Sequence, residues 1–250
     1  MLRIRTGYGI YRWRNPHIHT AGISLCSRMA PKELVELCLR DGLGGIVLTN
    51  HYKSPYVQGT FEEWRQRYVD EYEETRAIGE SAGLRVFFGV EFTLDCMMRN
   101  DFTVYGLSTD DILEAPALYT LSLPQLADYV HSKNALLYHA HPFRNTVPVD
   151  GRYLDGTEIN CHPLYRTCAE KRVREFADRY SLRISCGSDY HGDTYKARCG
   201  MLIPESVDST EKFTEFLREN KRPTLVVAPD PTPDMDIGPG KGGIIRSNGI

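Results

Sequence analysis

The sequence predicts a single α/β barrel domain, and three observations support this fold class. Short apolar runs typical of buried strands alternate with longer segments whose apolar residues recur at helical spacing. The chain has 250 residues, and about six to eight strand–helix units fit one barrel of mostly parallel strands at this length. Histidines and acidic residues follow several apolar runs, where the carboxyl ends of parallel strands form active sites. A doubly wound open sheet is the alternative architecture.

The predicted elements of the first half begin with the strand that ends at NPHIHT. A helix opened by Pro31 follows, and Asp41-Gly42 ends it. The run GGIVLTN is a buried strand, and a long helix is predicted over about residues 61–82, with Gly83 as its stop. LRVFFGVEF and DFTVYGL are the next two strands.

The second half continues the same alternation. The predicted helices are SLPQLADYVHSKN, CAEKRVREFADRY and TEKFTEFLREN, and the predicted strands are ALLYHAHPF, TEIN, LRISCGSDYH and PTLVVA. Residues 229–250 are rich in proline and glycine and have no period, so we expect a surface tail after a barrel domain over residues 1–228.

Composition excludes several classes of protein. The formal net charge of −3, with both signs mixed along the chain, gives no electrostatic footprint for extended nucleic acid. No apolar stretch is long enough to cross a membrane, and residues 1–16 contain no apolar run typical of a signal peptide. The seven cysteines are scattered without a CxxC pair, which argues against a disulfide framework. A reducing cytoplasm is the expected compartment.

Polar residues with metal-binding chemistry gather at the predicted strand ends. Seven of the eight histidines lie at these strand ends, and only His131 lies in a predicted helix. Three acidic residues lie at strand ends as well. The full set is His17, His19, His51, Glu91, His139, His141, Glu158, His162, Asp189 and His191. Side chains two residues apart on a strand share a face, so each HxH or DxH pair points to one side.

A single histidine after a strand is more often a hydrogen-bonded loop residue than a ligand. Glu91 within an apolar strand is more unusual, because a buried carboxylate costs several kcal/mol unless it is paired or coordinated. Five strand ends with such residues indicate a shell of imidazoles and carboxylates for Zn, Mn or Fe. This many ligands predicts more than one divalent ion, with Glu91 as a shared ligand.

Six motifs in order resemble the polymerase and histidinol phosphatase (PHP) family. NPHIHT resembles the family's D-x-H-x-H-T, LTNHYKS its T-D-H, GVEF its G-x-E, AHPFR its H-P, TEIN its E-x-N and GSDYH its G-S-D-x-H. The resemblance runs from about residue 15 to 200. It implies a distorted seven-stranded (β/α) barrel, similar to a TIM barrel, with a site for two or three divalent metal ions.

The resemblance also implies ligand sets. The first metal takes His17, His19, Glu91 and Asp189. The second takes Glu91, His141 and a residue after TEIN, with His162 preferred and Cys161 as the alternative. The third takes His51 and His191, but the segment ISLCS offers no histidine or aspartate as the further ligand usual at that site. Asn15 and Asn50 replace the family's usual aspartates, and His139 is expected to lie behind the ligands.

The implied activity is metal-dependent hydrolysis of a small phosphate monoester, such as histidinol phosphate or a nucleotide, by a metal-activated hydroxide. Arg144 and Arg198 are candidates to bind the phosphate, because a guanidinium binds phosphoryl oxygens bidentately. The predicted catalytic residues are Asp189, His51 and His191, and either histidine can protonate the leaving oxygen if it holds no metal.

Three other functions stay open. One is a phosphodiesterase or exonuclease that acts on short oligonucleotides. Another is an amidohydrolase-type C–N hydrolase, although that class usually bridges its metals with a lysine rather than a glutamate. The third is a non-catalytic metal-binding regulator, which the two asparagines and the weak third site would suit. The expected partner of a phosphoesterase is a small phosphorylated substrate, with no membrane and no extended nucleic acid.

Overall fold

The computed structural model describes residues 3–6, 9–144, 148–162, 169–192, 199–227 and 243–245. Within these ranges, the strands are β1 (Arg3–Thr6), β2 (Gly9–Ile18), β3 (Gly45–Leu48), β4 (His51–Tyr52), β5 (Arg85–Thr93), β6 (Asp101–Tyr105), β7 (Leu136–His139), β8 (Gly156–Asn160), β9 (Arg183–Gly187), β10 (Cys199–Pro204), β11 (Leu225–Val227) and β12 (Gly243–Ile245). The α-helices are α1 (Pro31–Arg40), α2 (Phe61–Ala82), α3 (Thr109–Glu114), α4 (Leu123–Ser132), α5 (Glu170–Tyr180) and α6 (Thr210–Glu219).

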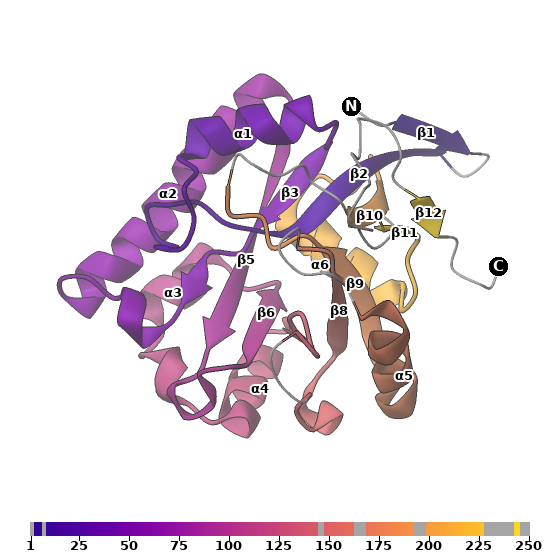
Figure 1. Cartoon of the computed structure of the whole chain (residues 1–250). Coiled ribbons are helices and arrows are strands. Elements are labelled where there is room, and N and C mark those ends of the chain that lie inside the picture. Colours follow the sequence, from indigo (N-terminus) through magenta and orange to yellow (C-terminus); the bar gives the residue numbers. More distant parts are fainter. Residues whose placement is uncertain are drawn as a thin grey trace, which may run out of the picture.

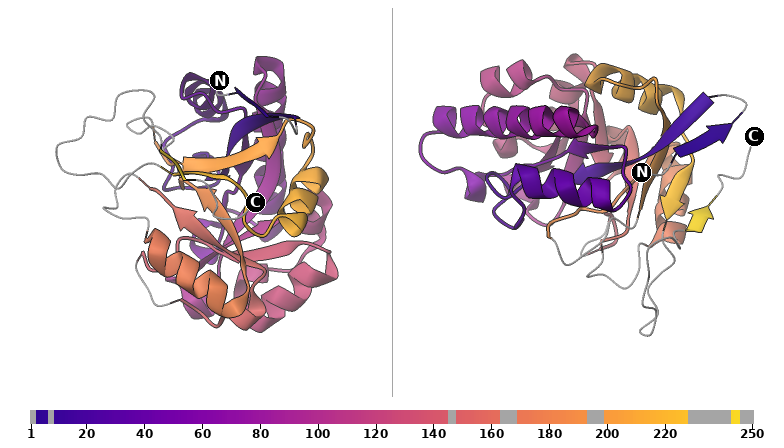
Figure 2. Two further views of the ribbon diagram at one scale, coloured as in Figure 1. Left: turned by 90° about the vertical axis from the view of Figure 1, so that its right-hand side faces the viewer. Right: turned by 90° about the horizontal axis from the view of Figure 1, so that it is seen from above.

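A nearly closed barrel forms the centre of the molecule. Its strands follow the order β2-β3-β5-β6-β7-β8-β9, and the bridge between Ile18 and Tyr190 brings the end of the series back to β2. The helices lie around this sheet, with α1 and α2 packed side by side (Figures 1 and 2). The predicted seven-stranded α/β barrel is confirmed.

The barrel is not wholly parallel. Strand β6 runs antiparallel to both β5 and β7, whereas the other barrel pairs are parallel. The connection between β5 and β6 covers only residues 94–100, and a parallel crossover needs about a dozen residues or more. As a result, β6 begins at the end of the barrel where the parallel strands finish.

Additional strands extend the sheet outside the barrel. Strand β10 pairs antiparallel with β2 and β11 pairs with β10, while β1 folds back on β2 as a hairpin (Figure 2). Strands β1 and β10 and the short helix α3 were not predicted from the sequence. Of the predicted tail, Gly243–Ile245 forms β12 against β11, and the rest lies outside the described residues.

Helix α2 has the bounds that its sequence predicts, because both ends carry strong signals. The Thr60 hydroxyl accepts the backbone N–H of Glu63, and the Glu63 carboxylate accepts the backbone N–H of Thr60. Gly83 ends the helix with φ of 86°, in the left-handed region that glycine tolerates best. Trp64 and Tyr68 on its inner face pack against Tyr52, just beside the carboxyl ends of the barrel strands.

No described helix is both long enough and apolar enough to cross a lipid bilayer.

Candidate metal centre

The centre starts at the end of β2, where His17 and His19 share the face that points into the barrel mouth. Both side chains are fully buried, and their Nε2 atoms lie 3.1 Å apart. Alternation along the strand accounts for this, because Ile18 between them turns to the hydrophobic core. The two nitrogens therefore face the same point in the barrel mouth.

Two carboxylates converge on the same point from other strands. Glu91 lies within β5, and its Oε1 is 3.2 Å from His17 Nε2. Asp189 follows β9, and its Oδ1 is 3.0 Å from His19 Nε2. One ligand atom from each of the four side chains lies within 4.8 Å of the others. The four residues that the family resemblance assigns to the first metal are thus brought together.

Several atoms at this centre have no hydrogen-bond partner among the described residues. They are His51 Nδ1, Glu91 Oε2 and Asp189 Oδ1, all buried. His51 Nδ1 lies 2.9 Å from Glu91 Oε2, yet the pair lacks hydrogen-bond geometry. Buried polar atoms without partners cost about 1–3 kcal/mol each. A divalent cation would satisfy these lone pairs, so the residues fit a metal.

Glu158 fixes the ring of His17. Its carboxylate oxygens lie 2.9 and 3.0 Å from His17 Nδ1, and they also accept the backbone N–H of His141 and the side-chain amide of Asn160. A carboxylate on Nδ1 keeps the proton there and leaves the Nε2 lone pair for a ligand. The TEIN motif thus serves the centre through Glu158, a role that was not predicted from the sequence.

A second network fixes His19. The Ser24 hydroxyl donates to Asn50 Oδ1 at 2.9 Å and accepts the backbone N–H of His51 at 2.9 Å. With its proton given to Asn50, Ser24 can only accept from His19 Nδ1, 3.1 Å away. His19 therefore also presents the Nε2 lone pair to the centre. Asn50 also donates its side-chain amide to the Thr20 hydroxyl, a bond that an ionised aspartate at this position could not make.

Asn15 bonds to backbone N–H groups and to Ser188 rather than to an imidazole. Its Oδ1 accepts the backbone N–H groups of His17 and Ser188, and its amide donates to the Ser188 hydroxyl. These bonds join the end of β2 to the turn after β9. Asn15 thus positions the backbone that carries His17 and Asp189, whereas Glu158 orients the imidazole.

The backbone is unusual at two of the candidate ligands. His141 has φ of 32° and Asp189 has φ of 53°, both in the left-handed region that non-glycine residues rarely adopt. Such conformations cost about 1–3 kcal/mol and cluster at functional sites. At both positions the chain leaves a strand and turns its side chain toward the centre.

The residues assigned to the second metal are only partly together. His141 Nε2 lies 3.0 Å from Glu91 Oε1, so these two share one edge of the centre. His162 instead groups with Asp189 and His191. Cys161, the alternative ligand, lies in a separate buried cluster with Cys186 and Cys199. His139 packs against Phe102 and Phe176 in the core.

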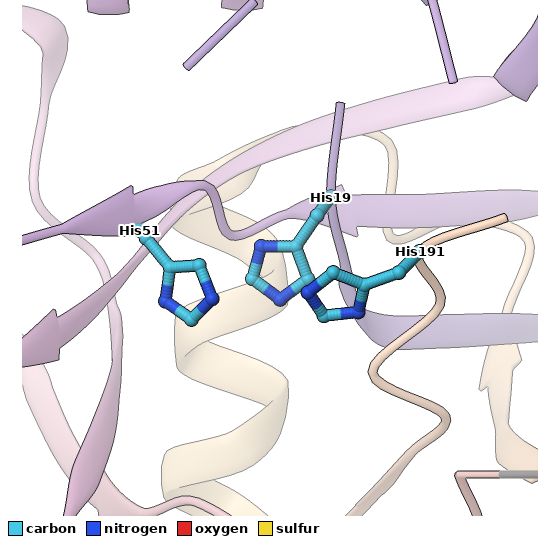
Figure 3. A group of neighbouring side chains, drawn as sticks. All are labelled: His19, His51 and His191. Atoms are coloured by element: carbon cyan, nitrogen blue, oxygen red, sulfur yellow. The ribbon is translucent and has the colours of Figure 1, made fainter. Parts of the chain in front are cut away.

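His51 and His191, assigned to the third metal, flank His19 (Figure 3). The ring centroid of His19 lies 4.6 Å from that of His51 and 4.3 Å from that of His191. Their nearest ligand nitrogens lie within 4.8 Å of one another. Strand β4 pairs with β5 so that His51 lies opposite Glu91, and this register places the His51 imidazole beside the Glu91 carboxylate.

Asp101 belongs to the same region, although it was not predicted from the sequence. It lies within 4.8 Å of ligand atoms of His51 and Glu91, and its Oδ2 is 3.7 Å from His141 Nε2. Asp101 begins β6, so only the antiparallel direction of that strand brings it to the centre. A pattern that looks for acids at strand ends could not find an acid at a strand start.

Arg144 reaches the centre from the loop after β7. Its Nη1 lies 2.5 Å from Asp189 Oδ2, and its Nη2 donates to Asn160 Oδ1. Arg198, the other predicted phosphate-binding residue, lies outside the described residues. A cavity of about 310 Å³ lies beside α5, lined by Phe143, Tyr180 and their neighbours, and its lining does not include the histidines. The chemistry, rather than cavity size, identifies the centre.

Electrostatics keep the two carboxylates ionised. Burial opposes charge on Glu91, but the nearby imidazoles of His17 and His51 hold its pKa well below its usual range. Burial likewise opposes charge on Asp189, and Arg144 with His191 holds its pKa well below the usual range. Burial next to His191 and His51 lowers the pKa of His19, so that imidazole is neutral and can bind a cation.

Comparisons with known proteins agree with this architecture. No protein-family model matches the chain, and no curated protein matches it. Among solved structures, a two-domain protein from Bacteroides vulgatus that contains a predicted PHP-like metal-dependent phosphoesterase is 16% identical, with a TM-score of 0.61 over 87% of this chain. The chain spans 65% of the length of that protein.

Two further solved structures share the fold. The lesion-specific endonuclease PfuEndoQ from Pyrococcus furiosus is 12% identical, with a TM-score of 0.55 over 84% of this chain and 56% of its own. An amidohydrolase from Chromobacterium violaceum, with bound sulfate and no metal, is 13% identical, with a TM-score of 0.52 over 82% of this chain and 96% of its own. The chain therefore has the fold of a PHP-like metal-dependent phosphoesterase, as its motifs predicted.

Proposed function

We propose that the protein is a metal-dependent phosphoesterase that hydrolyses a small phosphate monoester. The observation that carries the proposal is the convergence of His17, His19, Glu91 and Asp189 around buried lone pairs without hydrogen-bond partners among the described residues. These four residues would hold one divalent ion, and Glu91 would share its carboxylate with a second ion beside His141. Bound divalent ions supply Lewis acidity and an activated water for in-line attack on phosphorus.

The protein's own residues prepare the remaining steps. Arg144 would bind two phosphoryl oxygens through its guanidinium when substrate competes for the contacts now made to Asp189 and Asn160. His51 or His191 would protonate the leaving oxygen if it holds no metal. Glu158 and Ser24 keep His17 and His19 in the tautomers that a cation needs.

A phosphodiesterase or nuclease is the second candidate, supported by the fold shared with the endonuclease PfuEndoQ. The formal charge of −3 gives no general attraction for a long polyanion, so we favour a small substrate. An amidohydrolase is the third candidate, supported by the fold shared with the Chromobacterium violaceum enzyme. We place it below a phosphoesterase because a glutamate, Glu91, lies between the two groups of imidazoles where amidohydrolases usually carry a lysine.

We also propose a cytoplasmic location, because the six cysteines that the structure describes form no disulfide with one another.

Activity on a matched substrate panel tests the proposal. Metal-stripped protein, reloaded with Zn, Mn or Fe, is given phosphate monoesters, phosphodiesters and N-acyl compounds, and the released product is measured. We expect phosphate release from monoesters that depends on the added metal. Diester cleavage at a higher kcat/KM would favour the nuclease instead, and amine release without phosphate release would favour the amidohydrolase. Bound metal without turnover of any compound would favour the regulator.

A further inference from the structure

The loop after β2 is folded tightly against the metal centre. The backbone N–H of Ala21 donates to the Met29 carbonyl at 2.8 Å and closes the loop at its base. A turn at the tip is held by the N–H of Ser27, which donates to the Ser24 carbonyl at 2.7 Å. Ser24 is the same residue that orients His19, so the tip of this loop is tied to the centre.

A second set of bonds ties the loop to the segment after β9. The N–H of Arg28 donates to the His191 carbonyl at 2.8 Å, and the Ser27 hydroxyl shares its one proton between the carbonyls of His19 and His191. Residues 24, 27 and 28 are therefore all anchored near the imidazoles. Cys26 lies between these anchors, and its position relative to His191 is fixed from both sides.

Figure 3 shows the imidazoles of His51 and His191. The thiol of Cys26 is hydrogen-bonded to both of these side chains. The ligand nitrogens of these histidines lie within 4.8 Å of each other and of His19. His51 is buried, and its Nδ1, which faces Glu91, has no hydrogen-bond partner among the described residues. The Cys26 thiol thus neighbours two imidazoles, and one of them faces the Glu91 carboxylate.

We propose that Cys26 is a thiolate ligand of a zinc ion that it shares with His51 and His191. The proposal rests on the phosphoesterase metal centre proposed above and adds a ligand to it. The segment ISLCS offers neither histidine nor aspartate, yet its cysteine occupies the position from which the loop reaches both histidines. On binding, any proton carried by the Cys26 sulfur or by the two imidazoles is released to solvent, and the sulfur forms the bond to zinc.

The ligand type predicts which metal this position selects. One thiolate and two imidazoles are soft ligands that suit Zn²⁺, whereas Mn²⁺ and Mg²⁺ prefer carboxylate, carbonyl and water oxygens. The four-residue group of His17, His19, Glu91 and Asp189 has no sulfur and accepts harder ions. The two positions are therefore expected to differ in metal preference. With His51 and His191 both bound to zinc, neither would donate a proton to the leaving oxygen.

A reactive surface thiol is the competing explanation. Burial raises the pKa of the Cys26 thiol, but its hydrogen bonds to His191 and His51 outweigh this and lower the pKa to about 5. The residue is also exposed. A low pKa and exposure are typical of a cysteine that reacts with oxidants. Only a measurement that detects the metal–sulfur bond separates the two explanations.

Cobalt substitution makes that measurement without any need for turnover. Metal-stripped wild-type protein is loaded with Co²⁺, and the near-ultraviolet absorption of thiolate-to-cobalt charge transfer is recorded together with bound cobalt by elemental analysis. We expect the band in the wild type, its loss in Cys26→Ser and its retention in Cys96→Ser, a control at another exposed free cysteine. With zinc, Cys26→Ser should hold about one equivalent less than the wild type.

Each outcome decides a separate point. Cobalt that binds without the band, or a band that persists in Cys26→Ser, overturns the role of Cys26 and leaves the phosphoesterase proposal intact. A wild type that binds no divalent ion at all overturns the metal centre itself. Cys26→Asp guards against misfolding, because it should restore the zinc stoichiometry without the charge-transfer band. Failure of Cys26→Asp to bind that zinc, with native circular dichroism, would also count against the proposal.

Discussion

At the scale of the residue, the centre depends on groups that control the histidine tautomers. Glu158 receives hydrogen bonds from His17 Nδ1, from the backbone of His141 and from Asn160. Ser24 does the same for His19 through one hydroxyl whose proton goes to Asn50. Neither Glu158 nor Ser24 needs to touch a metal, yet each determines whether an imidazole presents a lone pair or a proton.

Glu158→Gln should weaken zinc binding by about 10–100-fold. A glutamine places an N–H₂ group where the carboxylate now accepts donors, so one of the three hydrogen bonds becomes a repulsive contact and His17 loses its orientation. Competition titration with a chromogenic chelator measures the change, and Glu36→Gln on the exposed face of α1 is the matched control. Equal zinc affinity in both variants and the wild type would contradict this role of Glu158.

His17→Ala should abolish turnover and lower the bound metal. His17 supplies an Nε2 atom that lies 3.2 Å from Glu91 Oε1 and 3.1 Å from His19 Nε2. His131→Ala is the control, because His131 lies on the surface of α4 and pairs only with Asp155 among the contacts that the structure describes. Elemental analysis and phosphate release are measured on both variants. Full activity in His17→Ala would refute the assignment of the centre.

At the scale of the element, close packing of β9 against β2 and β8 keeps the ligands in place. A Cβ atom added at Gly187 would lie 2.3 Å from Glu158 Oε1 and 2.5 Å from His17 Cβ. Real Cβ atoms do not approach so closely, so β9 can carry only glycine at this position without a shift. The same strand leads directly to Asp189, which connects sheet packing to ligand geometry.

Gly187→Ala should therefore reduce metal affinity and lower stability by about 1–3 kcal/mol, through displacement of the Glu158–His17 pair. Gly192→Ala provides the matched control, since a Cβ there meets nothing within 4 Å. Thermal unfolding with and without zinc reports both effects. If the two variants melt and bind alike, the proposed coupling between β9 packing and the centre is wrong.

Sequence motifs at the ends of the strands account for the part of the centre that could be predicted. Strand ends with an HxH, GVEF or GSDYH pattern identified His17, His19, Glu91 and Asp189, because parallel strands finish at one barrel end. Asp101 was missed because β6 runs the other way, and the antiparallel direction follows from a short connection rather than from β6 itself. Ser24 and Glu158 set the tautomers of His19 and His17 through contacts between residues 5 and 141 positions apart in the chain. Strand and helix patterns in the sequence do not show these contacts.

At the scale of the whole molecule, the barrel concentrates buried negative charge, which Arg144 balances in part and protons or metal ions balance further. Burial lowers the pKa of His17, but the charges of Glu158, Glu91 and Asp189 outweigh it and raise that pKa well above its usual value. Burial likewise opposes the charged form of His51, but Glu91 and Cys26 raise its pKa to about 10. The metal-free protein thus carries protons on these imidazoles at neutral pH.

Metal affinity should rise with pH. A cation must displace the protons on His17 and His51, and both pKa values lie above neutrality in the metal-free protein, so binding weakens as pH falls. We expect up to about a tenfold change per pH unit for each displaced proton. Isothermal titration calorimetry in buffers of different ionisation enthalpy counts the protons released. A zinc affinity that stays constant between about pH 6 and 8 would contradict this competition between protons and metal ions.

The rate of phosphate release from monoesters, by metal-stripped protein before and after reloading, tests the assignment of this barrel most directly. We predict negligible phosphate release without metal and recovery of release when Zn or Mn is added. Reloaded His131→Ala protein should recover fully, whereas reloaded His17→Ala protein should not recover. Release that is independent of metal, or reloaded His17→Ala protein that recovers like the wild type, would show that this barrel is not a metal-dependent phosphoesterase.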